Sequence, residues 1–185
     1  GWEAIIVDDG SRDETAAIAQ GFAEADARFR LIRQDNGGAG AARNSGIAAA
    51  SGEWIIFLDA DDVLAPDHLE RMLKAAETTP EAGLLHGGWR RFRDGQPWWT
   101  PHPARVLASP FAAAARGCPF AIHSAMTRRR HIVEAGAFDP SLRICEDWDL
   151  WQRIARTGVV FAAVPGVWAD VHVRPQSLSS DSGRH

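Results

Sequence analysis

Short apolar runs alternate with amphipathic segments along the first 80 residues of the chain. The runs at 4–8, 29–32 and 54–58 are rich in Ile, Val, Leu and Phe, which predicts three buried strands. Predicted helices follow each run, and they begin after the capping-box sequence at 11–14, within the glycine-rich segment 36–46 and at Pro66. Because strands and helices alternate, we expect an α/β fold with a mostly parallel central sheet and helices on both faces.

The second half of the chain has a less regular pattern. Asp94-Gly95 predicts the turn of a hairpin over 89–99, and an apolar stripe predicts an amphipathic helix over 147–157. The other expected elements are a small helix from Ser109-Pro110 to Gly117, a strand at 120–127, a helix at 129–136 and strands at 159–164 and 168–173. Because no repeat or linker interrupts the chain, we expect one domain over 1–178 and a flexible tail at 179–185.

Composition and charge narrow the classes of function. The 185 residues are 45% hydrophobic, and the formal net charge of −4 arises from interspersed acids and bases. This pattern lacks the basic surface of a nucleic-acid-binding protein, so we expect no nucleic acid partner. The basic triplet 128–130 is typical of a solvated helix start, with contact to a phosphate or an anionic membrane as the alternative.

Two cysteines are too few for a disulfide framework, and no apolar stretch of about 18 residues occurs. We therefore expect a cytoplasmic protein, with peripheral association at the inner face of the membrane left open.

Acidic residues stand where two of the predicted strands end. Asp8 and Asp9 close the first run, and Asp59, Asp61 and Asp62 follow the third. Ligands collect outside the carboxyl ends of parallel strands, so both groups are expected at one rim of the sheet. Neighbouring carboxylates raise one another's pKa unless a cation compensates, and oxygen ligands suit Mg²⁺ or Mn²⁺. The alternative, acids that cap the next turn and helix, explains Asp62 better than it explains the set.

A divalent ion held by two or three carboxylates keeps open positions for diphosphate oxygens, which indicates a nucleotide substrate. No phosphate-binding sequence of the G-x-x-x-x-G-K-[ST] type occurs. Arg43, in the turn after the glycines, has a fork of donors suited to a base or a phosphate, and pairing with a surface acid is the alternative.

A third acidic site lies at Glu146-Asp147, where the helix over 147–157 begins. Acids at this position serve as helix caps or dipole partners, or one of them is a general base. Trp148 and Trp151 follow, and they either belong to the core or offer a surface on which an acceptor stacks.

Three segments, in this order, resemble the family 2 glycosyltransferases, which are inverting enzymes of the GT-A fold that use nucleotide-sugar donors. They are VDDGSRDET, NGGAGAARNSGIAAASGEWIIFLDADD and GAFDPSLRICEDWDLWQRIAR, and the resemblance runs from Trp2 to about Ser177. It implies that Asp9 contacts the base of the donor nucleotide, with Ser11 in the same donor-binding element, and that Arg43 is a second nucleotide contact.

The resemblance also implies a metal site and a catalytic residue. Asp59 and Asp61 match the D-x-D motif that holds the metal and the donor diphosphate, with Asp61 the more direct ligand. Asp147 resembles the catalytic base. His172 resembles a histidine that some GT-A enzymes place near the donor phosphates or the metal; a surface or core histidine is the alternative. The implied cofactor is Mg²⁺ or Mn²⁺, and Asp59 serves both the donor and the metal.

The implied reaction is inverting transfer of a sugar from a nucleotide diphosphate donor, UDP-linked in our expectation, to a hydroxyl of a glycan, lipid-linked or small-molecule acceptor. Polysaccharide biosynthesis is the expected setting.

Two other functions are weighed against this one. A non-catalytic nucleotide-sugar-binding module would keep the same motifs. Residues 59–63 also fit the D-x-D-x-[TV] pattern of haloacid dehalogenase-like phosphatases, but those enzymes need a lysine far along the chain, and Lys74 is the only lysine here. The glycosyltransferase family opens with a strand of the type VSVIIPxYN and a helix that this sequence lacks. We therefore interpret the chain as an N-terminally truncated fragment.

Overall fold

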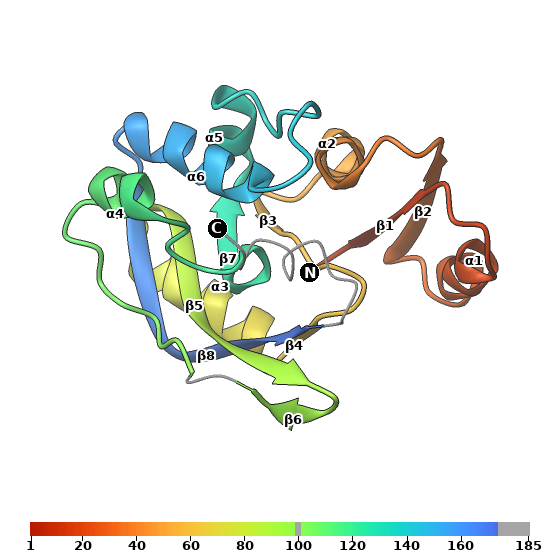
Figure 1. Cartoon of the computed structure of the whole chain (residues 1–185), viewed down its shortest axis with the longest axis horizontal. Coiled ribbons are helices and arrows are strands. Elements are labelled where there is room, and N and C mark those ends of the chain that lie inside the picture. The colour runs from red at the N-terminus through yellow and green to blue at the C-terminus, as the bar shows by residue number, and fades with distance from the viewer. Residues whose placement is uncertain (99–100, 174–185) are drawn as a thin grey trace.

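The chain forms two separate sheets, described by a computed structural model for residues 1–98 and 101–173 (Figure 1). In the smaller sheet, β1 (Ala4–Asp9) pairs in parallel with β2 (Phe29–Gln34). The larger sheet has the strand order β3-β7-β5-β8-β4, and β6 pairs with β5 outside this order. Its strands are β3 (Trp54–Ile56), β4 (Val63–Leu64), β5 (Ala82–Arg93), β6 (Gln96–Pro97), β7 (Ala125–Arg128) and β8 (Val160–His172).

The larger sheet is mixed, so the expectation of a mostly parallel sheet is wrong for it. Within the described ranges, β5 pairs in parallel with β8, whereas the pairs β3–β7, β7–β5, β8–β4 and β5–β6 are antiparallel. One reason lies in the connections. β5 and β6 are joined by the two-residue turn Asp94-Gly95, in which both residues have positive φ, and strands joined by so short a turn run antiparallel.

Helices cover both faces of the larger sheet, which confirms the α/β class. On one face, α6 packs Leu150 and Trp151 into a cluster with Leu84 of β5; on the other, α3 packs Met72 against Leu85. Neighbouring residues of β5 thus point to opposite faces, as strand geometry requires. The helices are α1 (Thr15–Ala25), α2 (Ala39–Ala49), α3 (His68–Thr78), α4 (Pro110–Arg116), α5 (Arg129–Glu134), α6 (Glu146–Arg156) and the 3-10 turn η1 (Ile122–Ser124).

Three local expectations differ from the structure. The capping box expected at 11–14 does not form, because α1 begins after Glu14, whose side chain makes no capping hydrogen bond. The strands expected at 159–164 and 168–173 are one strand, β8. β5 begins at Ala82, before the expected hairpin at 89–99. The sequence did not predict residues 82–88 as a strand because they are buried on both faces and therefore lack the polar–apolar alternation of a half-exposed strand.

Helix α2 connects the small sheet to the rest of the protein. Figure 1 shows the small sheet and α1 at one end of the molecule, with α2 between them and α5 and α6. The Asn44 amide donates to the Phe138 carbonyl at 2.8 Å, and its oxygen accepts the Phe138 N–H at 2.9 Å. A Cβ at Gly40 would lie 3.3 Å from the Asp139 carbonyl oxygen, so a glycine lets α2 approach this segment closely.

None of the described helices is long and apolar enough to cross a bilayer. The expected domain boundary at 178 and the tail at 179–185 lie outside the described residues.

Candidate active site

Arg43 joins two of the three acidic segments that the sequence singles out. Its Nη2 lies 2.7 Å from Oδ1 of Asp59, and its Nη1 lies 2.5 Å from Oε1 of Glu146. The side chains of Arg43 and Glu146 are 12% and 13% exposed, whereas that of Asp59 is 41% exposed. Burial acts against the charge of Arg43, but the two carboxylates outweigh it, so the Arg43 pKa is raised. Residues more than 100 positions apart are thus held together by one guanidinium group.

Asp9 anchors the glycine-rich loop at the start of α2. Its Oδ1 accepts hydrogen bonds from the Gly37 N–H at 2.9 Å and from the Gln34 amide at 2.7 Å, and its Oδ2 accepts the Gly38 N–H at 2.7 Å. Gly38 has a φ of 85°, a conformation that favours glycine. The sequence therefore needs both the acid and the glycine to build this turn.

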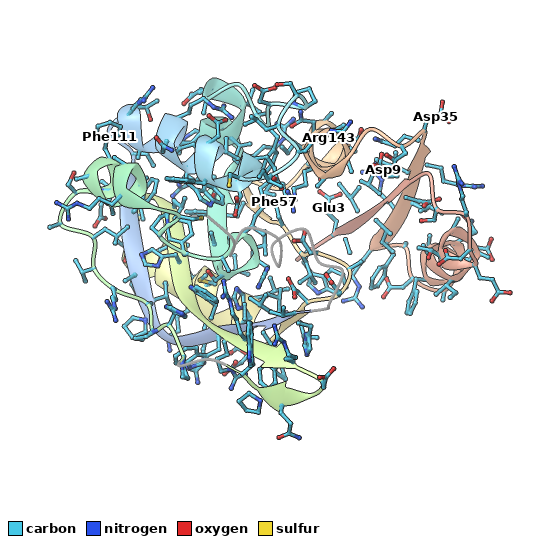
Figure 2. The ribbon with its side chains drawn as sticks, viewed as in Figure 1. Glu3, Asp9, Asp35, Phe57, Phe111 and Arg143 are labelled. Atoms are coloured by element: carbon cyan, nitrogen blue, oxygen red, sulfur yellow. The ribbon has the colours of Figure 1, made fainter. Side chains whose placement is uncertain are left out.

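Asp9 and Asp59 do not share a sheet edge, because β1 and β3 belong to different sheets. Within residues 1–98 and 101–173, the hydrogen bonds of the Asp9 carboxylate go to residues 34–38 rather than to the acids after β3. Figure 2 shows Asp9 and Asp35 beside the small sheet, whereas Phe57 lies in the larger part of the protein. The role of Asp9 in contacting a nucleotide base stays a prediction.

Ser11 lies in the turn after β1 and is exposed. Its N–H donates to Oδ1 of Asp8 at 3.0 Å, and hydrogen bonds from the Ser11 side chain and main chain lower the pKa of Asp8, which is buried. Asp8 therefore shapes the turn that presents Ser11 to solvent, and a donor contact by Ser11 stays a prediction.

A second acidic cluster lies in the loop after β3. Oxygens of Asp59 and Asp62 and a ring nitrogen of His123 lie within 4.8 Å of one another, which makes them a group that could hold a metal ion. The side chain of Asp62 is 6% exposed; its Oδ1 accepts the His172 main-chain N–H at 2.7 Å, and its Oδ2 lies 3.2 Å from Nδ1 of His123. Asp61 is partly buried in the same loop but does not belong to this group.

The residues of this group fit a divalent cation. His123 is 2% exposed, and among the described residues neither of its ring nitrogens has a partner with hydrogen-bond geometry, despite the short distance to Asp62. Burial lowers the His123 pKa to about 4, so near neutral pH the imidazole is uncharged and a ring nitrogen can act as a ligand. Carboxylates together with one imidazole suit Mn²⁺, and the carboxylates also suit Mg²⁺.

His172 lies beside this group through its main chain. Its N–H bonds to Asp62, and its ring stacks on Phe92 with centroids 5.5 Å apart. His123 was not among the residues singled out from the sequence. Asp62 was grouped with the acids after the third run, with capping as the alternative, but it was not named as a metal ligand. The available signal for His123 was weak: a histidine within the run at 120–127, where a strand was expected, with Ile122 before it and Ser124 after it.

Asp147 lies in the first turn of α6, next to Glu146. Its Oδ1 accepts the Trp148 N–H at 2.7 Å, and its Oδ2 lies 3.7 Å from the Cys118 sulfur. Burial raises the pKa of Asp147, Glu146 raises it further, and Arg43 lowers it. A carboxylate with a raised pKa is a better proton acceptor, which is what a general base needs.

The two tryptophans of α6 differ in burial, since Trp148 is partly buried and Trp151 is fully buried. Trp151 is fully buried in the main hydrophobic cluster, so the core interpretation holds for it and the acceptor surface does not. The indole N–H of Trp148 donates to the Ala114 carbonyl of α4. Trp148 therefore helps to fix the N-terminal end of α6, where Asp147 lies.

Comparison with known proteins identifies the family. The model of "Glycosyl transferase family 2" matches residues 1–136. The chain is 33% identical over 191 residues to the succinoglycan biosynthesis protein ExoO of Rhizobium meliloti, a match that covers 96% of this chain and 54% of ExoO. It is 53% identical over 74 residues to the putative glycosyltransferase EpsH of Bacillus subtilis, covering 40% of this chain and 22% of EpsH. The chain thus spans about half or less of the length of these relatives.

Solved structures show the same fold. The structure of S. aureus TarS 1–349 in complex with UDP-GlcNAc matches with a TM-score of 0.71 at 18% identity, covering 96% of this chain and 51% of TarS 1–349. The complex with UDP matches with a TM-score of 0.63. These matches confirm the expected GT-A-type α/β fold.

Proposed function

Because the chain belongs to glycosyl transferase family 2, we propose that it transfers a sugar from a nucleotide diphosphate donor, UDP-linked, to a hydroxyl group with inversion at the anomeric carbon. The observation that carries the proposal is the ion cluster of Arg43, which brings the loop after β3 and the start of α6 to one place. The UDP-GlcNAc bound by TarS supports the choice of donor, and the name of ExoO supports a role in polysaccharide synthesis.

On the donor side, Arg43 and Asp59 face the nucleotide, and Asp9 and Ser11 form the turn beside it. A divalent cation, Mg²⁺ or Mn²⁺, would be held by Asp59 with Asp62 and His123, the group that the geometry favours, or with Asp61 and His172, which the family resemblance implies. When bound, the cation would neutralise charge on the departing diphosphate.

On the acceptor side, Asp147 removes the proton of the attacking hydroxyl group. Its raised pKa and its place beside Glu146, which Arg43 ties to Asp59, support this assignment. A single displacement by that hydroxyl group inverts the anomeric carbon. The acceptor class (glycan, lipid-linked or small molecule) and a location in the cytoplasm or at the inner face of the membrane stay predictions.

Sugar transfer by the naturally encoded protein tests the proposal. The protein would be incubated with UDP-, GDP- and dTDP-sugars and Mn²⁺, and nucleotide release would be followed together with the anomeric configuration of the product. Release of UDP with an inverted product supports the proposal. Tight donor binding without release by wild type, with every acceptor class supplied, would favour the non-catalytic module.

A further inference from the structure

Glu146 is adjacent to the proposed base but is engaged elsewhere. Its carboxylate is 13% exposed, and its Oε1 accepts a hydrogen bond from Arg43 at 2.5 Å. It is not a helix cap, because the N-cap of α6 is Cys145, in a left-handed conformation with φ 61°. Its function must therefore be sought in its contact with Arg43.

Arg43 is held on three sides. Glu146 and Asp59 bind different nitrogens of the guanidinium group, whose carbon lies 5.4 Å from the centroid of the Phe138 ring. The neighbouring Asn44 fixes the Phe138 main chain by two hydrogen bonds. Of the two anions, Glu146 is the less exposed and Asp59 the more exposed.

We propose that Glu146 is a positioning residue for sugar transfer, which holds the guanidinium group of Arg43 in place beside Asp59. It thereby links the loop 59–62 to α6, the helix that carries Asp147. This inference rests on the proposed function. It assigns Glu146 an effect on donor binding, whereas a general base or an acceptor contact would act only once the acceptor is present.

The expected consequence follows from the geometry. Without the Glu146 carboxylate, Arg43 keeps one anionic partner in the cluster, Asp59, and turns toward it. The guanidinium group then neutralises Asp59, the acid proposed to contact the metal and the diphosphate. It is also no longer held in the position from which it would contact the nucleotide. Loss of one charged hydrogen bond should weaken the affinity for UDP at least about tenfold.

The experiment measures binding of UDP with Mn²⁺ by calorimetry, without acceptor, in the naturally encoded protein. Glu146→Ala should weaken UDP binding at least about tenfold, and Glu146→Gln, whose amide oxygen still accepts from Arg43, should lose less. In an Arg43→Met background, Glu146→Ala should have little further effect, because both residues act through one contact. Glu134→Ala, the same change at an exposed site on α5, is the matched control.

Each outcome decides the question. Unchanged UDP affinity in Glu146→Ala, with wild type binding UDP, overturns the positioning role, and a fall in kcat alone would then assign Glu146 to the acceptor side. Equal losses from Glu146→Ala in the wild-type and Arg43→Met backgrounds also overturn it. Failure of wild type to bind any of UDP, GDP and dTDP with Mn²⁺ removes the proposed function, and the positioning role with it.

Discussion

Replacing Arg43 by Met should destabilise the protein by about 3 kcal/mol. Met has a flexible side chain that fills the space but carries no charge, so the largely buried carboxylate of Glu146 loses its cation. Removing one partner of a buried ion pair costs roughly 3–5 kcal/mol, because the other charge stays buried and unpaired. Asp59 is 41% exposed and can be hydrated, so we expect the lower end of this range.

Urea and thermal unfolding measure this change. For a domain of this size, a loss of about 3 kcal/mol lowers the melting temperature by roughly 6–12 °C. Adding Glu146→Gln to Arg43→Met removes the unpaired charge, so the double variant should recover most of the lost stability.

Arg71→Met is the matched control. Arg71 forms an i,i+4 pair with Asp67 at 2.6 Å, but both side chains are about half exposed, so its loss should cost less than about 0.5 kcal/mol. The reasoning fails if Arg43→Met loses no more stability than Arg71→Met, or if Glu146→Gln brings no recovery.

Four further predictions concern chemistry, pH and metal. Asp147→Asn should lower kcat at least about 10²-fold and leave donor affinity nearly unchanged, as sugar transfer and calorimetry would show. Burial raises the Asp147 pKa in the folded state, so ionisation of this carboxyl group lowers the stability of the fold as pH rises through the folded-state pKa. The melting temperature of Asp147→Asn should therefore be higher than that of wild type near pH 7 but not near pH 3. Burial lowers the His86 pKa to about 4, so the neutral imidazole contributes to stability above about pH 6.5, and this contribution is lost as pH falls toward 4. In His86→Leu, the free energy of unfolding should therefore fall less steeply over this pH range. Excess chelator should weaken UDP binding, and Asp62→Asn should remove this metal-dependent part, because Asp62 belongs to the group that could hold the ion. Loss with Asp61→Ala alone would instead assign the ligand to Asp61, and equal affinity with chelator and with Mn²⁺ would exclude the metal.

Local patterns predicted most of the elements. The apolar stripe of 147–157 corresponds to α6, whose Leu150 and Ile154 are fully buried, because helical spacing directly encodes which face is covered. Ser109 caps α4 as its position before Pro110 indicates, since its hydroxyl oxygen accepts the Ala112 N–H. These features depend on residues a few positions apart.

Pairing between distant strands could not be predicted in the same way. β7 lies between β3 and β5 although it follows β5 in the chain, and no local spacing encodes that neighbour. The partner of Arg43 is a similar case. A surface acid was the alternative to a nucleotide contact, and the structure places Arg43 against two acids, one of them 103 positions away and only 13% exposed.

Charge balance explains how acids can gather here and why a cation is still expected. The loop 59–62 contributes three carboxylates, Glu146 contributes a fourth, and Arg43 contributes one positive charge. The formal charge of this group is therefore −4 + 1 = −3. His123 adds no charge near neutral pH, because burial lowers its pKa to about 4. Arg43 thus compensates Asp59 and Glu146 in the absence of a ligand, but a donor diphosphate approaching a site with this balance would still be repelled. A divalent cation would reduce the balance to −1, and for this reason we expect nucleotide affinity to depend on metal even though Arg43 is part of the site.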